Sequence, residues 1–176
     1  SKLGVVPTQI APGDVYPALE RGAIDAAEFV GPYDDEKLGF IRVAKYYYYP
    51  GWWEGGAMLH LIIGKDAWNK LPKHYQAIVQ NACEAANNWM LAKYDFVNPG
   101  GLRRLVAQGA QLRGFPLPVM EAALKAAEEY YAETSAKSPD FKKGYDSMVA
   151  FRGENLLWWQ VAELSYDSFM NRLKAR

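Results

Sequence analysis

The first third of the chain alternates short apolar runs with short amphipathic segments. Val5–Ile10 and Ala23–Val30 have the apolar character of strands, and a helix capped by Asp14 is predicted between them. Val43–Tyr49 is β-prone through its tyrosines. Ala57–Ile63 is a continuous apolar run between glycines, which is typical of a strand buried on both faces. Strands that alternate with helices predict an α/β arrangement for this part of the chain.

The pattern becomes helical after residue 64. A long helix is predicted from about Pro72, with apolar residues at helical spacing as far as Phe96. The sequence Asn98-Pro99-Gly100-Gly101 that follows either ends this helix or kinks it.

The last part of the chain is predicted to be a short strand followed by two helices. The strand is expected at Ala110–Phe115, and the helices at Val119–Ala136 and from about Asp140 to Arg176. One face of the terminal helix carries Leu157, Val161, Leu164, Ser165 and Phe169. We therefore expect an α/β segment, residues 1–64, that carries the candidate site residues, and a mainly helical segment, residues 65–176.

Composition and charge narrow the class of protein. The chain has 20 Lys and Arg against 20 Asp and Glu, a balance that argues against nucleic-acid binding. Cys83 is the only cysteine, so neither a disulfide nor a cysteine zinc site is expected, and we predict it to be a small buried hydrophobe. No apolar run approaches the roughly 18–20 residues that span a bilayer. The chain shows no signal peptide and opens on a strand-like segment, so we expect a processed or truncated product.

Glu28 stands at the end of a predicted apolar strand, immediately before Phe29. A carboxylate is costly to bury there unless it is paired or bound to a cation. Ligands of open α/β sheets bind at strand ends, which makes Glu28 a candidate ligand-binding residue. The alternative is a solvated side chain or a structural salt bridge.

The aromatic segment from Tyr46 to Gly56 is the second candidate region. Its tyrosines and tryptophans combine apolar rings with hydrogen-bonding tips, which suits the wall of a pocket for a small polar ligand, although the same rings can simply build a core. Glu54, beside Trp52 and Trp53, is a second acidic candidate.

Catalytic motifs are scarce in this sequence. No HExxH, Walker or GxGxxG motif is present, and the chain has two histidines. An enzyme remains the alternative: a small acid/base enzyme acting on a 2-oxo acid would use Glu28 or Glu54 as its general base, with a paired acid nearby.

Two blocks of sequence resemble a known family. The runs Leu3–Pro7, Gly13–Glu28 and Gly31–Asp35 resemble the DctP-type solute-binding proteins of TRAP transporters. Lys45–Gly56, with its four tyrosines followed by Pro-Gly-Trp-Trp-Glu, resembles the branch that binds 2-oxo acids and lactate. The resemblance implies an α/β fold of the two-lobed periplasmic-binding-protein type, class II, here only its carboxy-terminal portion, with long helices at the end.

The resemblance also implies a function. Such a protein is periplasmic, binds a small 2-oxo or 2-hydroxy monocarboxylate such as pyruvate, and delivers it to the membrane permease of the transporter. The ligand is held through a bound cation, for which we expect sodium rather than calcium. The expected cation ligands are Glu28, the backbone carbonyl of Phe29, where the family more often has tryptophan, and Glu54. The expected residues around the carboxylate ligand are Glu28, Tyr33, Tyr48, Trp52 and Trp53.

Part of the family's site is expected outside this chain. The arginine that grips the ligand carboxylate and a glutamine that binds the cation lie upstream of its first residue in the family, so the chain alone is expected to bind weakly or not at all. The resemblance also implies a homodimer through the terminal helix; the alternative is that this helix folds back over its own lobe. A third interpretation is that the helical half is an interaction module.

Overall fold

The computed structural model describes residues 1–57 and 59–173, which form two compact units. One unit spans residues 6–117, and the other combines residues 1–5 with the helices from 118 to 173. The division after residue 64 that the sequence suggested stays a prediction. Within the described ranges, no helix combines the length and the apolar character that crossing a bilayer requires.

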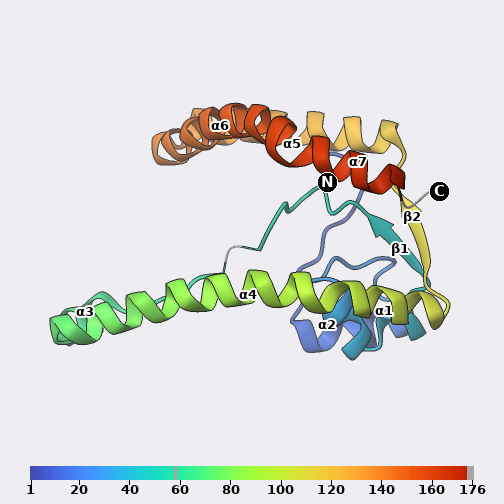
Figure 1. Cartoon of the computed structure of the whole chain (residues 1–176), viewed down its shortest axis with the longest axis horizontal. Helices are drawn as coiled ribbons and strands as arrows, with labels where there is room; N and C mark the ends of the chain where they lie inside the picture. The colour runs from blue at the N-terminus through green and yellow to red at the C-terminus, as the bar shows by residue number, and fades with distance from the viewer. Residues whose placement is uncertain (58, 174–176) are drawn as a thin grey trace. The chain divides into compact units, whose positions relative to one another are not determined.

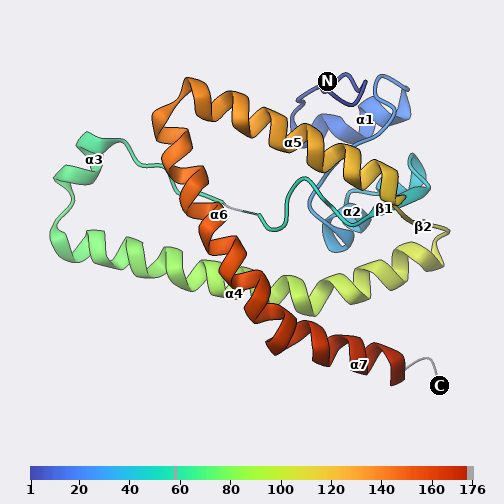
Figure 2. The same cartoon turned by 90° about the horizontal axis from the view of Figure 1, so that it is seen from above.

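The unit of residues 6–117 is built around one long helix. Its helices are α1 (Val15–Glu20), α2 (Pro32–Lys37), α3 (Lys65–Lys70) and α4 (Lys73–Ala107), with 3₁₀ turns at Pro12–Asp14 and Phe40–Arg42. Figures 1 and 2 show α2 beside the carboxy-terminal half of α4, and α3 at its amino-terminal end. The predicted long helix is confirmed.

Two short strands of this unit pair in parallel. β1 (Tyr46–Tyr49) and β2 (Gln111–Gly114) align so that Tyr46 faces Gln111 and Tyr49 faces Gly114. Parallel neighbours need a long crossover, and α3 with α4 supplies it. The strands expected within Val43–Tyr49 and Ala110–Phe115 are therefore confirmed.

Three other strand predictions are wrong: these segments form no strand among the residues that the structure describes. Val5–Ile10, Ala23–Val30 and Ala57–Ile63 are irregular in the structure, and within residues 1–57 and 59–173 they join no ladder. Met58 lies outside the described residues. Ala57–Ile63 was expected to be buried on both faces, but Ile62 is 89% exposed. An apolar run becomes a strand only when a neighbouring strand completes its hydrogen bonds, and the described residues provide no such neighbour here.

One helix cap and the burial of Cys83 differ from the sequence-based expectation, and of the two alternatives for Asn98-Pro99-Gly100-Gly101 the helix end is excluded. The side chain of Asp14 accepts no capping hydrogen bond from the described residues, because Asp14 ends a 3₁₀ turn that leads directly into α1. Asn98-Pro99-Gly100-Gly101 does not end α4, which continues through Pro99 to Ala107. Cys83, predicted to be buried, is exposed on the same helix.

The second unit is helical. It contains α5 (Leu117–Lys137), α6 (Pro139–Trp159), one π-helical turn (Gln160–Leu164) and α7 (Ser165–Leu173), which confirms both predicted helices except for residues 174–176, which lie outside the described range. Figure 2 shows the sharp turn between α5 and α6. At this turn Ser138 Oγ accepts the Phe141 N–H at 3.2 Å, a side-chain cap for α6.

The α5–α6 turn is packed by aromatic rings. The ring of Tyr131 lies 4.9 Å from that of Tyr145 and 6.4 Å from that of Phe141, centroid to centroid. Aromatic pairs at such distances stabilise a contact beyond the area they bury. These rings hold the amino-terminal end of α6 against α5.

The apolar core is small, and its buried members lie mostly in α1, in the 3₁₀ turn at Phe40–Arg42 and at the carboxy-terminal end of α4. Its buried members are Val15, Ala18, Phe40, Leu105 and Ala110, with Ala123 in the helical unit. Leu105, in the last turns of α4, is 2% exposed. Many other large apolar side chains are exposed, most of all along residues 59–62 and the α6–α7 segment.

We expect Leu105→Ala to lower the free energy of unfolding by about 2–5 kcal/mol, because a buried leucine leaves a cavity when truncated. Leu91→Ala is the matched control, since Leu91 lies on the same helix and is 64% exposed. It should change the free energy of unfolding by only about 0.5 kcal/mol. Urea unfolding followed by circular dichroism measures both; equal losses would contradict the assigned core.

Candidate functional site

The segment before α2 carries the first two candidate residues. Glu28 is exposed, and Phe29 is half-buried with its ring edge-on to the buried ring of Phe40, at 5.2 Å between centroids. Because the Phe29 side chain is anchored in this way, the main chain beside Glu28 has a defined position. That main chain leads through Gly31 into α2.

The first turn of α2 concentrates negative charge. Asp35 is 7% exposed, and its Oδ2 accepts a hydrogen bond of 2.5 Å from the Tyr47 hydroxyl of β1. Burial raises the pKa of Asp35 from its ordinary value near 3.8 to about 6; the Tyr47 hydrogen bond opposes this rise, and the charges of Asp34 and Glu28 add to it. Burial, followed by the hydrogen bond to Asp35, raises the pKa of Tyr47.

Two carboxylate oxygens in this turn are buried without a donor from the described residues: Asp34 Oδ2 and Asp35 Oδ1. Negative charge that is buried and only partly paired is costly, and a hard cation bound by oxygen ligands would relieve it. Among residues 1–57 and 59–173, no three His, Cys, Asp or Glu side chains are placed to hold a metal ion together.

The aromatic candidates Tyr48 and Trp53 pack against Phe115, and Trp52 packs against Trp53. Ring centroids are 5.1 Å apart for Tyr48 and Phe115, 6.1 Å for Trp53 and Phe115, and 5.2 Å for Trp52 and Trp53. Successive side chains of a strand point to opposite faces, so Tyr47 turns toward Asp35 while Tyr48 joins this cluster. Trp52 Nε1 is buried and finds no acceptor among the described residues, so the cluster offers one unused N–H donor.

Phe115 packs with these candidates, and the sequence did not single it out. It directly follows β2, and its N–H donates to the Tyr49 carbonyl at 2.8 Å, which places its ring beside the end of β1. Only the pairing of two strands more than sixty residues apart reveals this position.

Tyr33 occupies a different place from the aromatic cluster. Its hydroxyl accepts a hydrogen bond of 2.5 Å from Lys37 Nζ, and this lysine lowers the pKa of Tyr33. Its ring lines a cavity of about 240 Å³ whose other walls come from α4: Trp89, Met90, Lys93 and Tyr94. Its expected contact with the ligand stays a prediction.

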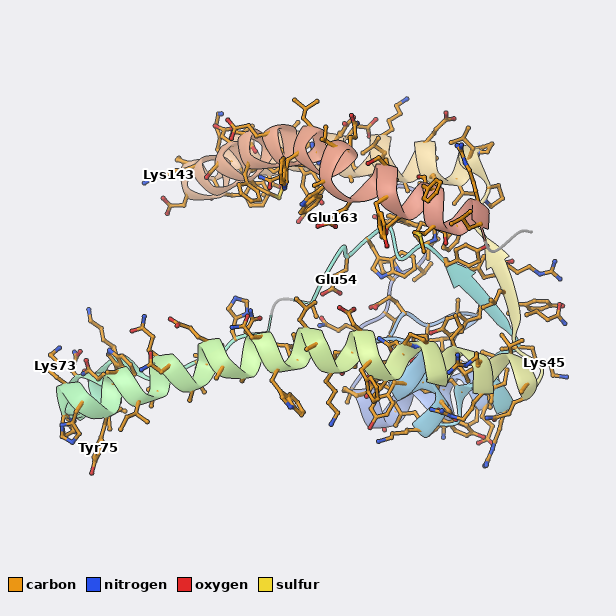
Figure 3. The ribbon with its side chains drawn as sticks, in the orientation of Figure 1. Lys45, Glu54, Lys73, Tyr75, Lys143 and Glu163 are labelled. Carbon is orange, nitrogen blue, oxygen red and sulfur yellow. The ribbon has the colours of Figure 1, made fainter. Side chains whose placement is uncertain are left out.

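Glu54 lies on the connection between β1 and α3, where Figure 3 labels it. Its side chain is exposed, and it forms no hydrogen bond or ion pair with any residue that the structure describes. Its expected role as a cation ligand stays a prediction.

Residues of α4 contact α2, and the sequence reasoning assigned them no role. Asn98 Oδ1 accepts the Tyr33 N–H at 3.1 Å. Arg104 forms a two-pronged ion pair with Glu36, at 2.6 Å from Nε to Oε1 and 2.8 Å from Nη2 to Oε2. The only sequence signal was an Asn-Pro-Gly-Gly run that does not end its helix.

Comparison with known proteins identifies the family. Residues 1–138 match the model of the bacterial extracellular solute-binding proteins, family 7, called DctP. The chain belongs to this family. DctP membership confirms the family that the sequence blocks resembled and the extracytoplasmic location expected from it.

Individual DctP relatives match nearly the whole chain. A monocarboxylate 2-oxoacid-binding periplasmic protein of Nostoc sp. PCC 7120 is 47% identical over 169 residues, which are 96% of this chain and 46% of the relative. A TRAP-transporter solute-binding protein from Bordetella bronchiseptica is 50% identical over 99% of this chain and 52% of its own, with a TM-score of 0.92. Its structure is a mixed-occupancy dimer with copurified calcium and picolinate bound in one active site and the other site apo.

A third relative has pyruvate bound. A TRAP periplasmic solute-binding protein from Colwellia psychrerythraea, solved with calcium and pyruvate, is 37% identical over 95% of this chain and 51% of its own, with a TM-score of 0.89. These structural matches confirm the predicted periplasmic-binding-protein type of fold. The chain spans about half the length of these relatives, and they are named as solute-binding proteins rather than enzymes.

The raised pKa of Asp35 predicts a pH dependence of stability. Between about pH 4 and pH 6 the folded state holds a proton on Asp35 that the unfolded state has lost, so this residue's contribution to stability falls as the pH rises through that window. Asp35→Asn removes the titration but keeps an oxygen that accepts from Tyr47. Between pH 4 and pH 7, the free energy of unfolding of the wild type should fall by up to about 3 kcal/mol more than that of this variant. Urea unfolding of both proteins at both pH values tests this. If the difference in free energy of unfolding between wild type and variant is the same at pH 4 and pH 7, the prediction is wrong.

Proposed function

We propose that the chain is the carboxy-terminal portion of an extracytoplasmic solute-binding protein that binds a small 2-oxo or 2-hydroxy monocarboxylate together with a cation. The observation that carries this proposal is 47% identity over 96% of the chain to a protein named for monocarboxylate 2-oxoacid binding. In a TRAP transporter such a protein delivers its ligand to the membrane permease, which is therefore the proposed protein partner.

The proposed cation ligands are the Glu28 carboxylate, the Phe29 carbonyl and the Glu54 carboxylate. The anchored Phe29 ring and the partly paired negative charge of Asp34 and Asp35 support a cation beside this segment. A bound cation would neutralise the carboxylates of the protein and of the ligand at the same time. Among the solved relatives, the Bordetella protein holds calcium with picolinate, the Colwellia protein holds calcium with pyruvate, and one from Pseudoalteromonas atlantica holds sodium with pyruvate. We propose sodium for this chain.

The proposed acid-binding wall is formed by Tyr48, Trp52 and Trp53. The rings of Tyr48 and Trp53 pack with Phe115 and that of Trp52 packs with Trp53, and Trp52 contributes a buried N–H to which a carboxylate or keto oxygen can act as acceptor. Glu28 contacts the ligand through the cation, and Tyr33 is proposed as a further contact from the start of α2. Flat apolar rings around a few polar groups suit a small acid such as pyruvate.

The remainder of the site is proposed to come from a complementary amino-terminal portion of about equal length. Two facts support this: the chain spans about half of its relatives, and Leu59, Leu61 and Ile62 present apolar side chains to solvent. Exposed apolar patches of this kind mark contact surfaces. An arginine for the ligand carboxylate and a glutamine for the cation are expected in that portion.

The test is a thermal shift of the chain combined with this complementary portion, against pyruvate with sodium or calcium. Ligand at a hundredfold excess over Kd should stabilise the folded state by about 2.7 kcal/mol, and the shift should need both acid and cation. Glu28→Gln should abolish the shift because it removes the charged cation ligand. Glu84→Gln is the matched control, since Glu84 is an exposed glutamate on α4.

The proposal would be overturned if no pair of acid and cation changed the melting temperature of the reconstituted protein. Conversion of the 2-oxo acid during the assay would instead favour the acid/base enzyme that uses Glu28 or Glu54.

A homodimer through the α6–α7 segment is proposed as well. Leu157, Val161, Leu164 and Phe169 are all exposed there, and the Bordetella relative crystallised as a dimer. An apolar helical face of this extent is stable in water when another surface covers it.

We expect Leu157→Glu combined with Val161→Glu to convert the dimer to a monomer, because the charges would be buried at the contact. Met148→Glu is the control: Met148 is exposed on α6 but lies nine residues before Leu157, two and a half turns away and so on the opposite side of the helix. Analytical ultracentrifugation measures the mass; a monomeric wild type, or a dimer that both substitutions leave intact, would refute the proposed interface.

A further inference from the structure

The amino-terminal end of α2 is capped by a residue of another helix. The first N–H groups of a helix have no partner within it, and the residue before α2, Gly31, has no side chain to accept them. Asn98 of α4 fills this role, because its Oδ1 accepts the Tyr33 N–H at 3.1 Å in a half-buried contact between residues 65 positions apart. The start of α2 is thereby tied to one point on α4.

Gly101 makes the approach of the two helices close enough for this bond. Gly101 is buried, and a Cβ atom built on it would lie 2.9 Å from Tyr33 N and 3.0 Å from Pro32 C. Real Cβ atoms do not approach backbone atoms so closely, and the first turn of α2 would have to move. One turn of α4 therefore supplies both the cap and the space for α2.

The neighbouring Gly100 is in a different position. A Cβ on Gly100 would meet Arg104 Nη1 at 3.1 Å, the far end of an exposed side chain that can move aside. The Arg104–Glu36 pair is itself exposed on the arginine side, and exposed ion pairs contribute little. Of these contacts, those of Asn98 and Gly101 are the ones that fix the start of α2.

A displacement of this turn would reach the proposed cation ligands. Only Val30 and Gly31 separate Phe29 from Pro32, and residues 23–30 take part in no ladder with described residues that would hold them independently. The segment is instead held at the Phe29–Phe40 contact and at the start of α2. Oxygen ligands of hard cations lie at about 2.0–2.6 Å, so a shift of a few tenths of an ångström weakens coordination.

We propose that Asn98 and Gly101 are positioning residues of the cation site: they fix the amino-terminal end of α2 and, through it, the Glu28 carboxylate and the Phe29 carbonyl. This inference rests on the proposed function, since it assigns these residues a role in that same site. The two residues touch neither the cation nor the acid; they act through the first turn of α2.

The experiment compares two alanine substitutions in adjacent glycines of one helix. In the chain combined with its complementary portion, pyruvate binding is measured by calorimetry over a range of sodium and, separately, calcium concentrations. Gly101→Ala should raise the cation concentration for half-saturation at least tenfold, while binding at saturating cation is largely retained. Gly100→Ala should stay within twofold of the wild type, because its new methyl group meets only a movable side chain.

A second pair of variants separates positioning from loss of stability, and decides the matter if Gly101→Ala does not fold. Asn98→Ala removes the cap of α2, whereas Gln76→Ala removes an amide of the same helix that donates to the Trp68 and Leu71 carbonyls at 2.8 and 3.1 Å. Both should lower the melting temperature without ligand. Only Asn98→Ala should raise the cation requirement, at least threefold.

The outcomes distinguish this inference from the proposed function. Suppose that the wild type binds pyruvate with a cation, and that Asn98→Ala and Gln76→Ala need the same cation concentration for half-saturation. The positioning role is then wrong and the proposed function stands. The role is equally wrong if Gly101→Ala folds and matches Gly100→Ala. If the wild type binds no pair of acid and cation, the proposed function fails and the positioning role falls with it.

Discussion

The contact between α2 and the last turns of α4 determines how the candidate site is built. α2 has six residues, too few to be stable alone, and its cap comes from Asn98 rather than from its own sequence. On the other side, the Tyr47 hydroxyl of β1 binds Asp35. A short helix held between a long helix and a strand can carry buried carboxylates in a fixed position, which a free loop could not.

The same packing creates the electrostatics of the site. Asp35 is buried because α2 is held on both sides, and burial beside Asp34 and Glu28 is the reason that its carboxyl group retains a proton at higher pH than usual. The buried carboxylate oxygens of Asp34 and Asp35 that find no donor among the described residues are ligands of the kind that a hard cation prefers. Packing and charge therefore both support the proposal that the Glu28–Phe29 segment binds a cation.

The exposed apolar segments follow from a second constraint, that strands and amphipathic helices need partners. Residues 59–62 and the face of α6 and α7 present large apolar side chains to solvent. A chain that spans about half of its relatives has correspondingly fewer elements with which to cover them. Three of its strand-like runs, Val5–Ile10, Ala23–Val30 and Ala57–Ile63, are irregular where the structure describes them, although their composition is that of sheet interiors.

The sequence by itself determined the long helices, the two paired strands and the family, because helical spacing, tyrosine-rich β character and long motif blocks are local properties. It also pointed to Glu28, Phe29 and the Tyr48–Trp53 segment as candidates. It could not predict that Val5–Ile10 and Ala57–Ile63 lack partners, since a ladder depends on a second segment. Only the tertiary structure revealed the contacts of Phe115, Asn98 and Gly101, because each lies against residues more than sixty positions away, in contacts that no local pattern records.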